Sequence, residues 1–503
     1  MPPKYVLAID AGSSGVRCLI VDLNGRLVSL CREEWEYDTP ENIAPLGHQF
    51  DPASFWSATC RAIGSAIKES GVKPGDIVGV SATSQREGAV FLDEKGAELY
   101  AGPNIDLRAL TEGIAIDDEW GKEVYAITGH APAFMFVPAK LKWFENNEPE
   151  AYSRIATILT ISDWILYRLC GERMSEVSGA SELGLIDVRQ RQWSGRLQQL
   201  LHLPDGIYPR LSHAGNIAGK VVARAACETG LVAGTPVGVG APDAQCGLIA
   251  LGAEHEYQAG VVMGWSAPVQ LVTDAPIFDP EARVWTSCHV FPRKWILESS
   301  AGEVGSAYRW LKENLFASET DAYKLMDSLA GKIPPGAEGV LAFAGPSAMD
   351  MSRLGLKYGG FLFPVPFSVN NLDRAHLVKA VLENICFAIK ANCLQLETIS
   401  GSKISEARIG GSLAKGQSLG QTLAAVLAMP VVVPETTEVS GLGAAMCAAA
   451  ASGAYANLEE AVVAMGPETT VVEPDRLAVL EYDEHYRRWN AAAELLEKLS
   501  ELP

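Results

Sequence analysis

Short apolar runs separated by small-residue turns open the chain. Residues 5–9 form a continuous apolar run typical of a buried strand, and residues 16–21 form a second one. Between them lies a Gly/Ser-rich stretch, and Asn24-Gly25 after the second run is a strong hairpin signal. Residues 26–30 then continue as a third strand. We therefore expect the chain to begin as an antiparallel meander whose first turn is rich in glycine and serine.

Apolar residues with helical spacing alternate with further strand-like runs in the first half of the chain. Residues 55–69 have the spacing of an amphipathic helix, and residues 77–81 and 90–92 are apolar enough for buried strands. Further helices are expected at residues 110–121, 139–146 and 163–169. Alternation of this kind is the signature of an α/β fold.

The opening pattern recurs after residue 250. Residues 260–272 again read as strand, small-residue turn and strand, and residues 408–412, 419–428 and 431–433 continue as strand, helix and strand. This recurrence predicts a duplicated α/β protein with a cleft between the copies. We place the boundary near residue 250, which gives domains at residues 1–250 and 251–503.

Length and charge narrow the function classes. At about 150 residues per domain, 503 residues correspond to roughly three units or two large ones. The formal net charge of −20 disfavours binding to nucleic acid, which carries the same sign. Phosphorylated small molecules are still allowed, because backbone amides in a loop can hold a phosphate on an acidic protein.

Cysteine spacing and hydropathy indicate in which cellular compartment the protein is expected. The ten cysteines include no Cys-x-x-Cys pair, so buried reduced thiols are the favoured interpretation over a zinc site or disulfides. Residues 439–458 carry no charge, but they are mostly Ala, Gly and Ser and are too weakly apolar to span a membrane. We expect a helix buried in a protein core there, no membrane association, and a cytoplasmic protein.

The first turn is a candidate phosphate site. Successive amides at Gly12, Ser13 and Ser14 can form a concave anion site, and Arg17 can add a bidentate phosphate contact. Asp10, at the end of the strand, can hold a hydrated cation beside it. An ordinary hairpin with a capping aspartate is the alternative.

Two polar clusters suit the recognition of hydroxyl groups. Arg86 and Glu87, which follow the strand at residues 77–81, can donate to and accept from neighbouring hydroxyls. Asn104 and Asp106 offer a similar donor and acceptor shortly afterwards. A solvated ion pair between Arg86 and Glu87 is the alternative interpretation.

A third candidate lies where a strand runs into a helix near the domain boundary. Asp243 stands at the expected start of that helix, where aspartate often serves as an N-cap. The functional alternative is a general base at the mouth of the cleft. The small-residue loop at residues 410–416 is a fourth candidate, weak when taken alone.

The order of these motifs resembles the FGGY family of carbohydrate kinases over residues 4–490. The following segments carry the resemblance: Asp10, Gly12 and Ser13; Gln85, Arg86 and Glu87; Thr128-Gly129 with residues 140–147; Asp243, Ala244 and Gln245; residues 376–383; residues 441–445; Tyr482 and Tyr486. Within the family, the sequence is most similar to the autoinducer-2 kinases, and the pentulose kinases, such as xylulose kinases, are the neighbouring alternative.

The resemblance implies a duplicated actin/hexokinase-type (ribonuclease H-like) fold and ATP-dependent phosphorylation of a hydroxyl on a small sugar or sugar-like compound. Asp243 would be the catalytic base, and Mg²⁺ would be held near Asp10 through water. The residues implied at the sugar are Gln85, Arg86, Glu87, Asn104, Asp106, Asp243 and Gln245. Those implied at the nucleotide and its phosphates are Gly12, Ser13, Ser14, Arg17, Gly264, Ser266, Gly411 and Ser412. The implied partners are a sugar and a nucleotide, and a homodimer is left open.

Two positions depart from the family pattern. Trp265 stands in the second phosphate loop where the family usually has Thr, and Leu413 stands in the adenine-side loop where it usually has Gly. These departures motivate a second hypothesis, a non-catalytic sugar-binding regulatory protein on the same fold. Since tryptophan is usually buried, we expect the Trp265 indole to pack into the core of the second domain.

Overall fold

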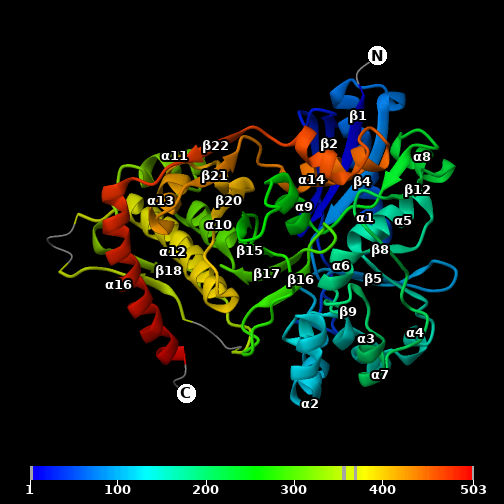
Figure 1. Cartoon of the computed structure of the whole chain (residues 1–503), viewed down its shortest axis with the longest axis horizontal. Coiled ribbons are helices and arrows are strands. Elements are labelled where there is room, and N and C mark those ends of the chain that lie inside the picture. The colour runs from blue at the N-terminus through cyan, green and yellow to red at the C-terminus, as the bar shows by residue number, and fades with distance from the viewer. Residues whose placement is uncertain (1–3, 354–357, 367–370, 501–503) are drawn as a thin grey trace.

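The computed structural model describes residues 4–353, 358–366 and 371–500, and it consists of two lobes, each built on a mixed β-sheet (Figure 1). The sheet of the first lobe has the strand order β12-β13-β4-β1-β2-β3, and that of the second has the order β16-β17-β15-β14-β20-β21-β22. The predicted two-part α/β architecture is therefore confirmed.

The first lobe opens with the expected meander. β1 (Tyr5–Gly12) pairs antiparallel with β2 (Gly15–Asp22), which pairs antiparallel with β3 (Leu27–Glu34). On its other side, β1 pairs parallel with β4 (Ile77–Ser84). The sheet continues through β13 (Pro236–Gly238) to β12 (Ile217–Lys220).

Both faces of this sheet are covered, which explains why β1 is apolar throughout rather than alternating. Leu7 and Ile9 of β1 pack toward α1 (Pro52–Ser70) and α5 (Ile161–Cys170). Val6 and Ala8, which point to the opposite face, pack in a separate cluster that includes α14 (Val439–Ala451). One strand therefore contributes to two hydrophobic cores.

The second lobe repeats the central arrangement of the first. β14 (Gln258–Val262) and β15 (Pro268–Thr273) form an antiparallel hairpin, and β14 pairs parallel with β20 (Glu406–Gly410). β21 (Val431–Pro434) and β22 (Thr469–Val472) extend one side of this sheet. β17 (Trp295–Ser300) and β16 (Trp285–Cys288) extend the other side.

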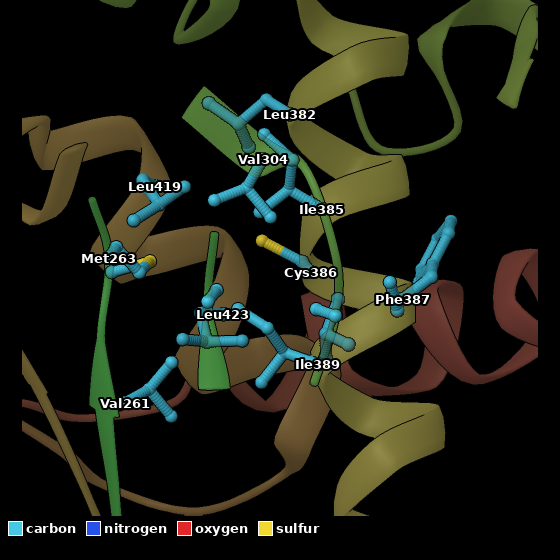
Figure 2. Packing of buried hydrophobic residues seen from close by; sticks show 14 of the residues in the cluster. Val261, Met263, Val304, Leu382, Ile385, Cys386, Phe387, Ile389, Leu419 and Leu423 are labelled. Carbon is cyan, nitrogen blue, oxygen red and sulfur yellow. The ribbon is translucent and has the colours of Figure 1, made fainter. Parts of the chain in front are cut away.

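A long helix, α12 (Arg374–Ser400), is the centre of the core of the second lobe. Figure 2 shows its apolar side chains, including Ile385 and Ile389, facing β14 and α13 (Gln417–Leu427). The helix begins with a capping box, in which Asp373 accepts a hydrogen bond from Ala375 N and His376 Nδ1 accepts one from Asp373 N. Local capping and a continuous apolar face thus fix this helix against the sheet.

Helix α14 belongs to the second half of the sequence but packs on the first sheet, where Figure 1 shows it in orange beside the blue strands. It is built from small residues, and close approach explains why. A Cβ at Gly79 of β4 would lie 2.5 Å from Ala448 O, and one at Gly443 would collide with Cys246 O of α9 (Asp243–Ala250). The buried helix predicted in the uncharged stretch at residues 439–458 is therefore confirmed over Val439–Ala451, whereas residues 452–457 form a turn.

The remaining elements complete the two lobes. β5 (Ala89–Leu92) pairs with β6 (Glu98–Gly102) and β7 (Thr157–Thr160) in a three-stranded sheet of the first lobe. Its other elements are α2 (Leu110–Thr128), α3 (Val137–Asn147), α4 (Pro149–Tyr152), β8 (Met174–Glu176), α6 (Val177–Glu182), β9 (Ile186–Asp187), β10 (Gln192–Trp193), α7 (Gly195–Leu200), β11 (Arg210–Ser212) and α8 (Ala223–Thr229). The elements in the second half of the chain that have not yet been named are α10 (Val304–Leu315), α11 (Ala322–Ala330), β18 (Leu341–Phe343), β19 (Gly360–Leu362), α15 (Leu458–Met465) and α16 (Arg476–Ser500). None of the helices in the described ranges is both long and apolar enough to cross a membrane.

The close packing of α14 predicts the effect of a single methyl group. We expect Gly443→Ala to lower the free energy of unfolding by about 1–3 kcal/mol, because the new Cβ would meet the backbone of α9. Gly64→Ala in α1 is the matched control, since its Cβ would lie 3.9 Å from Thr229 O, the nearest atom outside its own helix. That change should be neutral or stabilising by up to about 1 kcal/mol. Urea unfolding of both variants tests this packing, and equal effects would contradict it.

Candidate active site

A cleft of ≈ 1550 Å³ lies between the two lobes. Residues of both lobes line it, as the duplicated architecture predicts. The lining includes these candidates from the sequence: Gly12, Ser13, Ser14, Arg17, Gln85, Arg86, Glu87, Asn104, Asp243, Gly264, Ser266, Gly411 and Ser412. The structure thus brings together in one cleft segments that are up to 400 residues apart in the sequence.

The turn between β1 and β2 forms one wall of the cleft. The two strands stay paired as far as Gly12 and Gly15, so that Ser13 and Ser14 make up the tip. A side chain at Gly15 would collide with the backbone of Glu33 on β3, which explains a glycine at this position. Arg32 Nη2 donates a hydrogen bond of 3.2 Å to Ser14 Oγ. Small residues thus leave the turn open to a ligand in the cleft.

Arg17 lies beside this turn between two carboxylates. Its Nη2 is 2.5 Å from Asp10 Oδ2 and its Nη1 is 2.9 Å from Glu438 Oε2, which precedes α14. The negative charge of Asp10 raises the pKa of Arg17 above its ordinary value. The second oxygen of Asp10, Oδ1, is buried and has no hydrogen-bond partner among the described residues. A buried carboxylate oxygen of this kind, next to a candidate phosphate-binding turn, fits a hydrated divalent cation.

Asp243 is the first residue of α9, as the sequence predicts, and its carboxylate borders the cleft. Its Oδ1 accepts a hydrogen bond of 2.7 Å from Ala244 N. Burial and the nearby charge of Asp10 raise the pKa of Asp243 to about 7, against the opposing effect of Arg86 and Arg17. A carboxylate that titrates near neutrality is suited to act as a general base.

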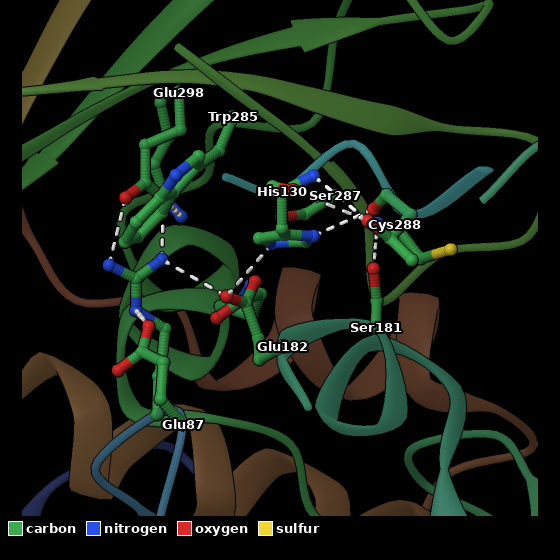
Figure 3. A network of polar contacts seen from close by, with 12 residues as sticks. Glu87, His130, Ser181, Glu182, Trp285, Ser287, Cys288 and Glu298 are labelled. Atoms are coloured by element: carbon green, nitrogen blue, oxygen red, sulfur yellow. Dashed lines mark hydrogen bonds and ion pairs between the residues drawn. The ribbon is translucent and has the colours of Figure 1, made fainter. Parts of the chain in front are cut away.

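Arg86 is almost buried among the carboxylates of three residues that Figure 3 labels, Glu87, Glu182 and Glu298. Its Nη1 and Nη2 donate to Glu298 of β17 at 2.6 and 2.8 Å. Its Nη1 also lies 3.5 Å from Glu182, and its Nε lies 3.6 Å from Glu87. The indole of Trp285 is 5.7 Å from the guanidinium. The alternative of a solvated Arg86–Glu87 pair is therefore wrong, since the two side chains are only 11% and 7% exposed.

The carboxylates around Arg86 differ in their titration. Burial, together with Glu182 and Glu298, raises the pKa of Glu87 to about 8, although Arg86 opposes this shift. Burial acts in the same direction on Glu182, but Arg86 and His130 outweigh it and lower its pKa to about 2. Glu87 is thus suited to donate a hydrogen bond at neutral pH, and Glu182 to stay ionised.

Asp106 and Gln245 do not line the cleft, in contrast to the substrate contacts that the resemblance implies. Asp106 is fully buried, and its carboxylate accepts hydrogen bonds from Tyr100 Oη at 2.5 Å and from His48 N at 2.9 Å. Gln245 is also fully buried and donates through Nε2 to Glu182 Oε1 at 2.6 Å. Neighbours in the fold satisfy the carboxylate of Asp106, whereas the Oε1 of Gln245 is buried with no partner among the described residues.

Gln85 and Asn104 do reach the cleft, and they are connected to each other. Gln85 Oε1 accepts a hydrogen bond of 3.2 Å from Asn104 N, and Gln85 Nε2 donates one of 2.8 Å to Tyr37 Oη. The Oδ1 of Asn104 is buried with no partner among the described residues, so it is available to a hydroxyl donor.

Trp265 is placed differently from the expectation that it packs into the core. Its indole is 49% exposed and lines the cleft, so that expectation is wrong. The reason lies in the backbone of the turn. Gly305, at the start of α10, donates from its N to Trp265 O at 3.0 Å, and a side chain at Gly305 would collide with Gly264 O. The backbone of the turn therefore packs directly against the start of α10, while the indole lies in the cleft.

The loop after β20 borders the same end of the cleft as Trp265. Gly411 has a φ of 96°, and a Cβ there would collide with Met263 O, so both the backbone conformation and the packing favour glycine. Leu413 lines the cleft while packing partly against the core of the second lobe. Cationic side chains that the motifs did not indicate also line the cleft, among them Arg309, Lys312 and Lys324.

Glu182, Glu298 and Trp285 are the other residues that the sequence analysis missed. One signal was available for Glu298. It interrupts an apolar strand, and the register places it directly opposite Gln270, a second polar interruption in β15. Two buried polar residues facing each other across apolar strands indicate a polar site on that face of the sheet.

Models of two domains match the chain. The N-terminal domain of the FGGY family of carbohydrate kinases matches residues 5–250, and the C-terminal domain matches residues 259–452. Autoinducer-2 kinases are similar over 472 residues, 91% of this chain and 88% of theirs, with 32% identity for that of Salmonella paratyphi B and 31% for that of Escherichia coli K12.

Solved structures agree with this assignment. A xylulose kinase from Rhodospirillum rubrum is 25% identical with a TM-score of 0.84, covering 99% of this chain and 100% of its own. One from Brucella ovis is 26% identical with a TM-score of 0.83, covering 98% and 100%. The chain therefore belongs to the FGGY family of carbohydrate kinases. It is a kinase.

The exposed indole in the turn between β14 and β15 leads to a prediction about stability and nucleotide binding. Trp265→Thr should change the free energy of unfolding by no more than about 0.5 kcal/mol, as is usual for exposed positions. The same change should tighten ADP binding, because it clears space at the turn. Calorimetric ADP titration and a melting curve test both parts. A marked fall in melting temperature with unchanged affinity would contradict the exposed placement.

Proposed function

We propose that the protein transfers the γ-phosphoryl group of ATP to a hydroxyl of a small sugar or sugar-like polyol or carbonyl compound. The observation that carries this proposal is the position of Asp243. Its carboxylate lies in the interlobe cleft with a pKa of about 7, in reach of both the phosphate turn and the Arg86 cluster. This arrangement favours catalysis over the non-catalytic alternative.

At the phosphate end, the two repeated turns position the donor. The amides of Gly12, Ser13 and Ser14 come from the first lobe, and Gly264 and Ser266 come from the second. Arg17 adds positive charge beside the first turn. Phosphoryl transfer depends mainly on such positioning and on electrostatic stabilisation of the transferred group. On the second lobe, Gly411 and Ser412 would contact the nucleotide.

A metal ion is part of the proposed donor complex. Asp10, through its free Oδ1, is the residue that would hold Mg²⁺, by way of water. The ion, when bound, offsets charge on the β- and γ-phosphates. Arg17 pairs with the other oxygen of Asp10, which leaves Oδ1 free to accept a hydrogen bond from such a water.

At the sugar end, Arg86 and Glu87 orient the acceptor. A neutral Glu87 donates to a substrate oxygen, while Asn104 Oδ1 and Gln85 can accept from or donate to further hydroxyls. Asp243 accepts the proton of the attacking hydroxyl as the phosphorus–oxygen bond forms. Closure of the lobes would exclude water, which otherwise competes as the acceptor.

The autoinducer-2 precursor is the substrate class that we favour, because curated autoinducer-2 kinases match most of the chain. Ketopentoses are the second candidate, because the structural neighbours include xylulose kinases at 25–26% identity. We also propose a cytoplasmic location, which ten free thiols support. The domain ranges matched by the family models support a division near residue 250. A homodimer stays a prediction.

A substrate panel tests the function. Purified protein with ATP and MgCl₂ should phosphorylate one of a set that contains the autoinducer-2 precursor, D-xylulose, D-ribulose and glycerol. Asp243→Asn should lower kcat by about 10²–10⁴-fold and leave sugar affinity nearly unchanged, because the amide cannot accept the proton. More than half of the wild-type turnover in this variant would remove Asp243 from the mechanism.

The two raised pKa values predict a bell-shaped pH dependence. Asp243 must be ionised to accept a proton, so kcat/KM should rise as the pH increases through about 7. Glu87 must be protonated to donate, so kcat/KM should fall again as the pH passes about 8. Glu87→Gln keeps a permanent donor and should abolish the fall at high pH while the rise stays. Because Asp243, Glu87 and their charged neighbours interact, each limb of the pH profile reports an apparent pKa of the cluster. A profile of Glu87→Gln that matches wild type would remove Glu87 from this role.

A further inference from the structure

Arg86 would be an obvious anchor for a negatively charged substrate if it stood alone. A guanidinium presents a planar fork that binds a carboxylate through two parallel hydrogen bonds. In this cleft, however, Glu298 already occupies the fork, with Nη1 and Nη2 at 2.6 and 2.8 Å from its two oxygens. Arg86 therefore reaches the cleft with its bidentate face already engaged.

The carboxylate that engages Arg86 comes from the opposite lobe. Glu298 is fully buried on β17, and its Oε2 also accepts a hydrogen bond of 2.9 Å from Gln270 Nε2 on the neighbouring strand. Trp285 of β16 lies against the same guanidinium. Gln270 and Trp285, both of the second lobe, thus contact the Glu298–Arg86 pair and help to fix its geometry.

Negative charge outnumbers positive charge around this point. Arg86 contributes one positive charge, whereas Glu298 and Glu182 both lie within 3.5 Å of its Nη1. Asp243 adds a further acidic group to the cleft lining. A sugar acid entering here would meet like charges in a largely desolvated place, and like-charge contacts of this kind are costly. A hydroxyl group carries no such cost and can still hydrogen-bond to Arg86 or Glu87.

We propose that Glu298 is a specificity-determining residue that cancels the charge of Arg86 from the opposite lobe and so restricts the sugar end of the cleft to uncharged polyhydroxy compounds. This inference rests on the proposed function and refines its substrate class. It predicts that sugar acids bind poorly to the natural protein. It also predicts that removal of the charge of Glu298 admits them.

Glu298→Gln tests the role of the charge with little change in shape. The buried Oε1 of Gln270, which has no partner among the described residues, can accept a hydrogen bond from the new amide, so the strand pairing should survive. Binding of xylitol and D-xylonate, two five-carbon chains that differ by a carboxylate, is measured by calorimetry in the presence of ADP and MgCl₂. We expect the ratio of D-xylonate to xylitol affinity to rise by about tenfold or more.

Two further variants separate charge from structure. Glu298→Asp keeps the charge and should leave the ratio close to that of wild type. Glu406→Gln, which breaks an ion pair with Arg408 in the same sheet, is the matched control and should also leave it unchanged. An unchanged ratio in Glu298→Gln, including the absence of any D-xylonate binding, overturns the proposal. If that variant fails to fold, Glu182→Gln removes the second carboxylate near Arg86 and must raise the ratio instead.

The outcome is independent of the test of catalysis. A wild-type protein that phosphorylates a sugar while Glu298→Gln shows an unchanged ratio refutes the specificity role and leaves the kinase function standing. A wild-type protein that phosphorylates no sugar in the panel refutes the proposed function, whatever the binding ratio shows.

Discussion

The burial of one guanidinium among carboxylates from both lobes is the interaction on which the candidate site depends. Removing charged groups from water is expensive unless they are paired with good geometry, and Arg86 meets this condition through its bidentate contact with Glu298 of the other lobe. The same charge opposes the raised pKa values of Glu87 and Asp243 and lowers that of Glu182. The relative position of the lobes and the protonation of the site are therefore linked.

The two lobes use the same local element for different chemistry. Each has a hairpin whose turn borders the cleft, but the turn of the first lobe adjoins Asp10 and Arg17, and that of the second adjoins α10. The first lobe supplies the acidic and amide groups suited to hydroxyls and a metal ion. The second supplies the additional cations and Trp265. The two lobes thus share a backbone arrangement and differ in the side chains that border the cleft.

Local sequence patterns predicted the strands, the repeated turns and the start of α9 at Asp243, because each depends on residues close together in the chain. Glu298 was missed because its partner Arg86 is 212 residues away. Asp106 looked like a free acceptor, although Tyr100 and His48 satisfy it in the fold. The burial tendency of tryptophan failed at Trp265, where the backbone of the turn packs against Gly305 and the indole is left in the cleft.

The position of α14 has a mechanical consequence. Both α14 and α15 pack with the first sheet, whereas β21 and β22 on either side of them belong to the second. The chain therefore crosses between the lobes near residues 251–257, 435–438 and 466–468. A body joined to another by several crossings can rotate about a line through them far more easily than it can slide. Opening and closing of the cleft should thus be a hinge rotation of one lobe relative to the other about these crossings. Glu438 and its partner Arg17 lie at one of the crossings.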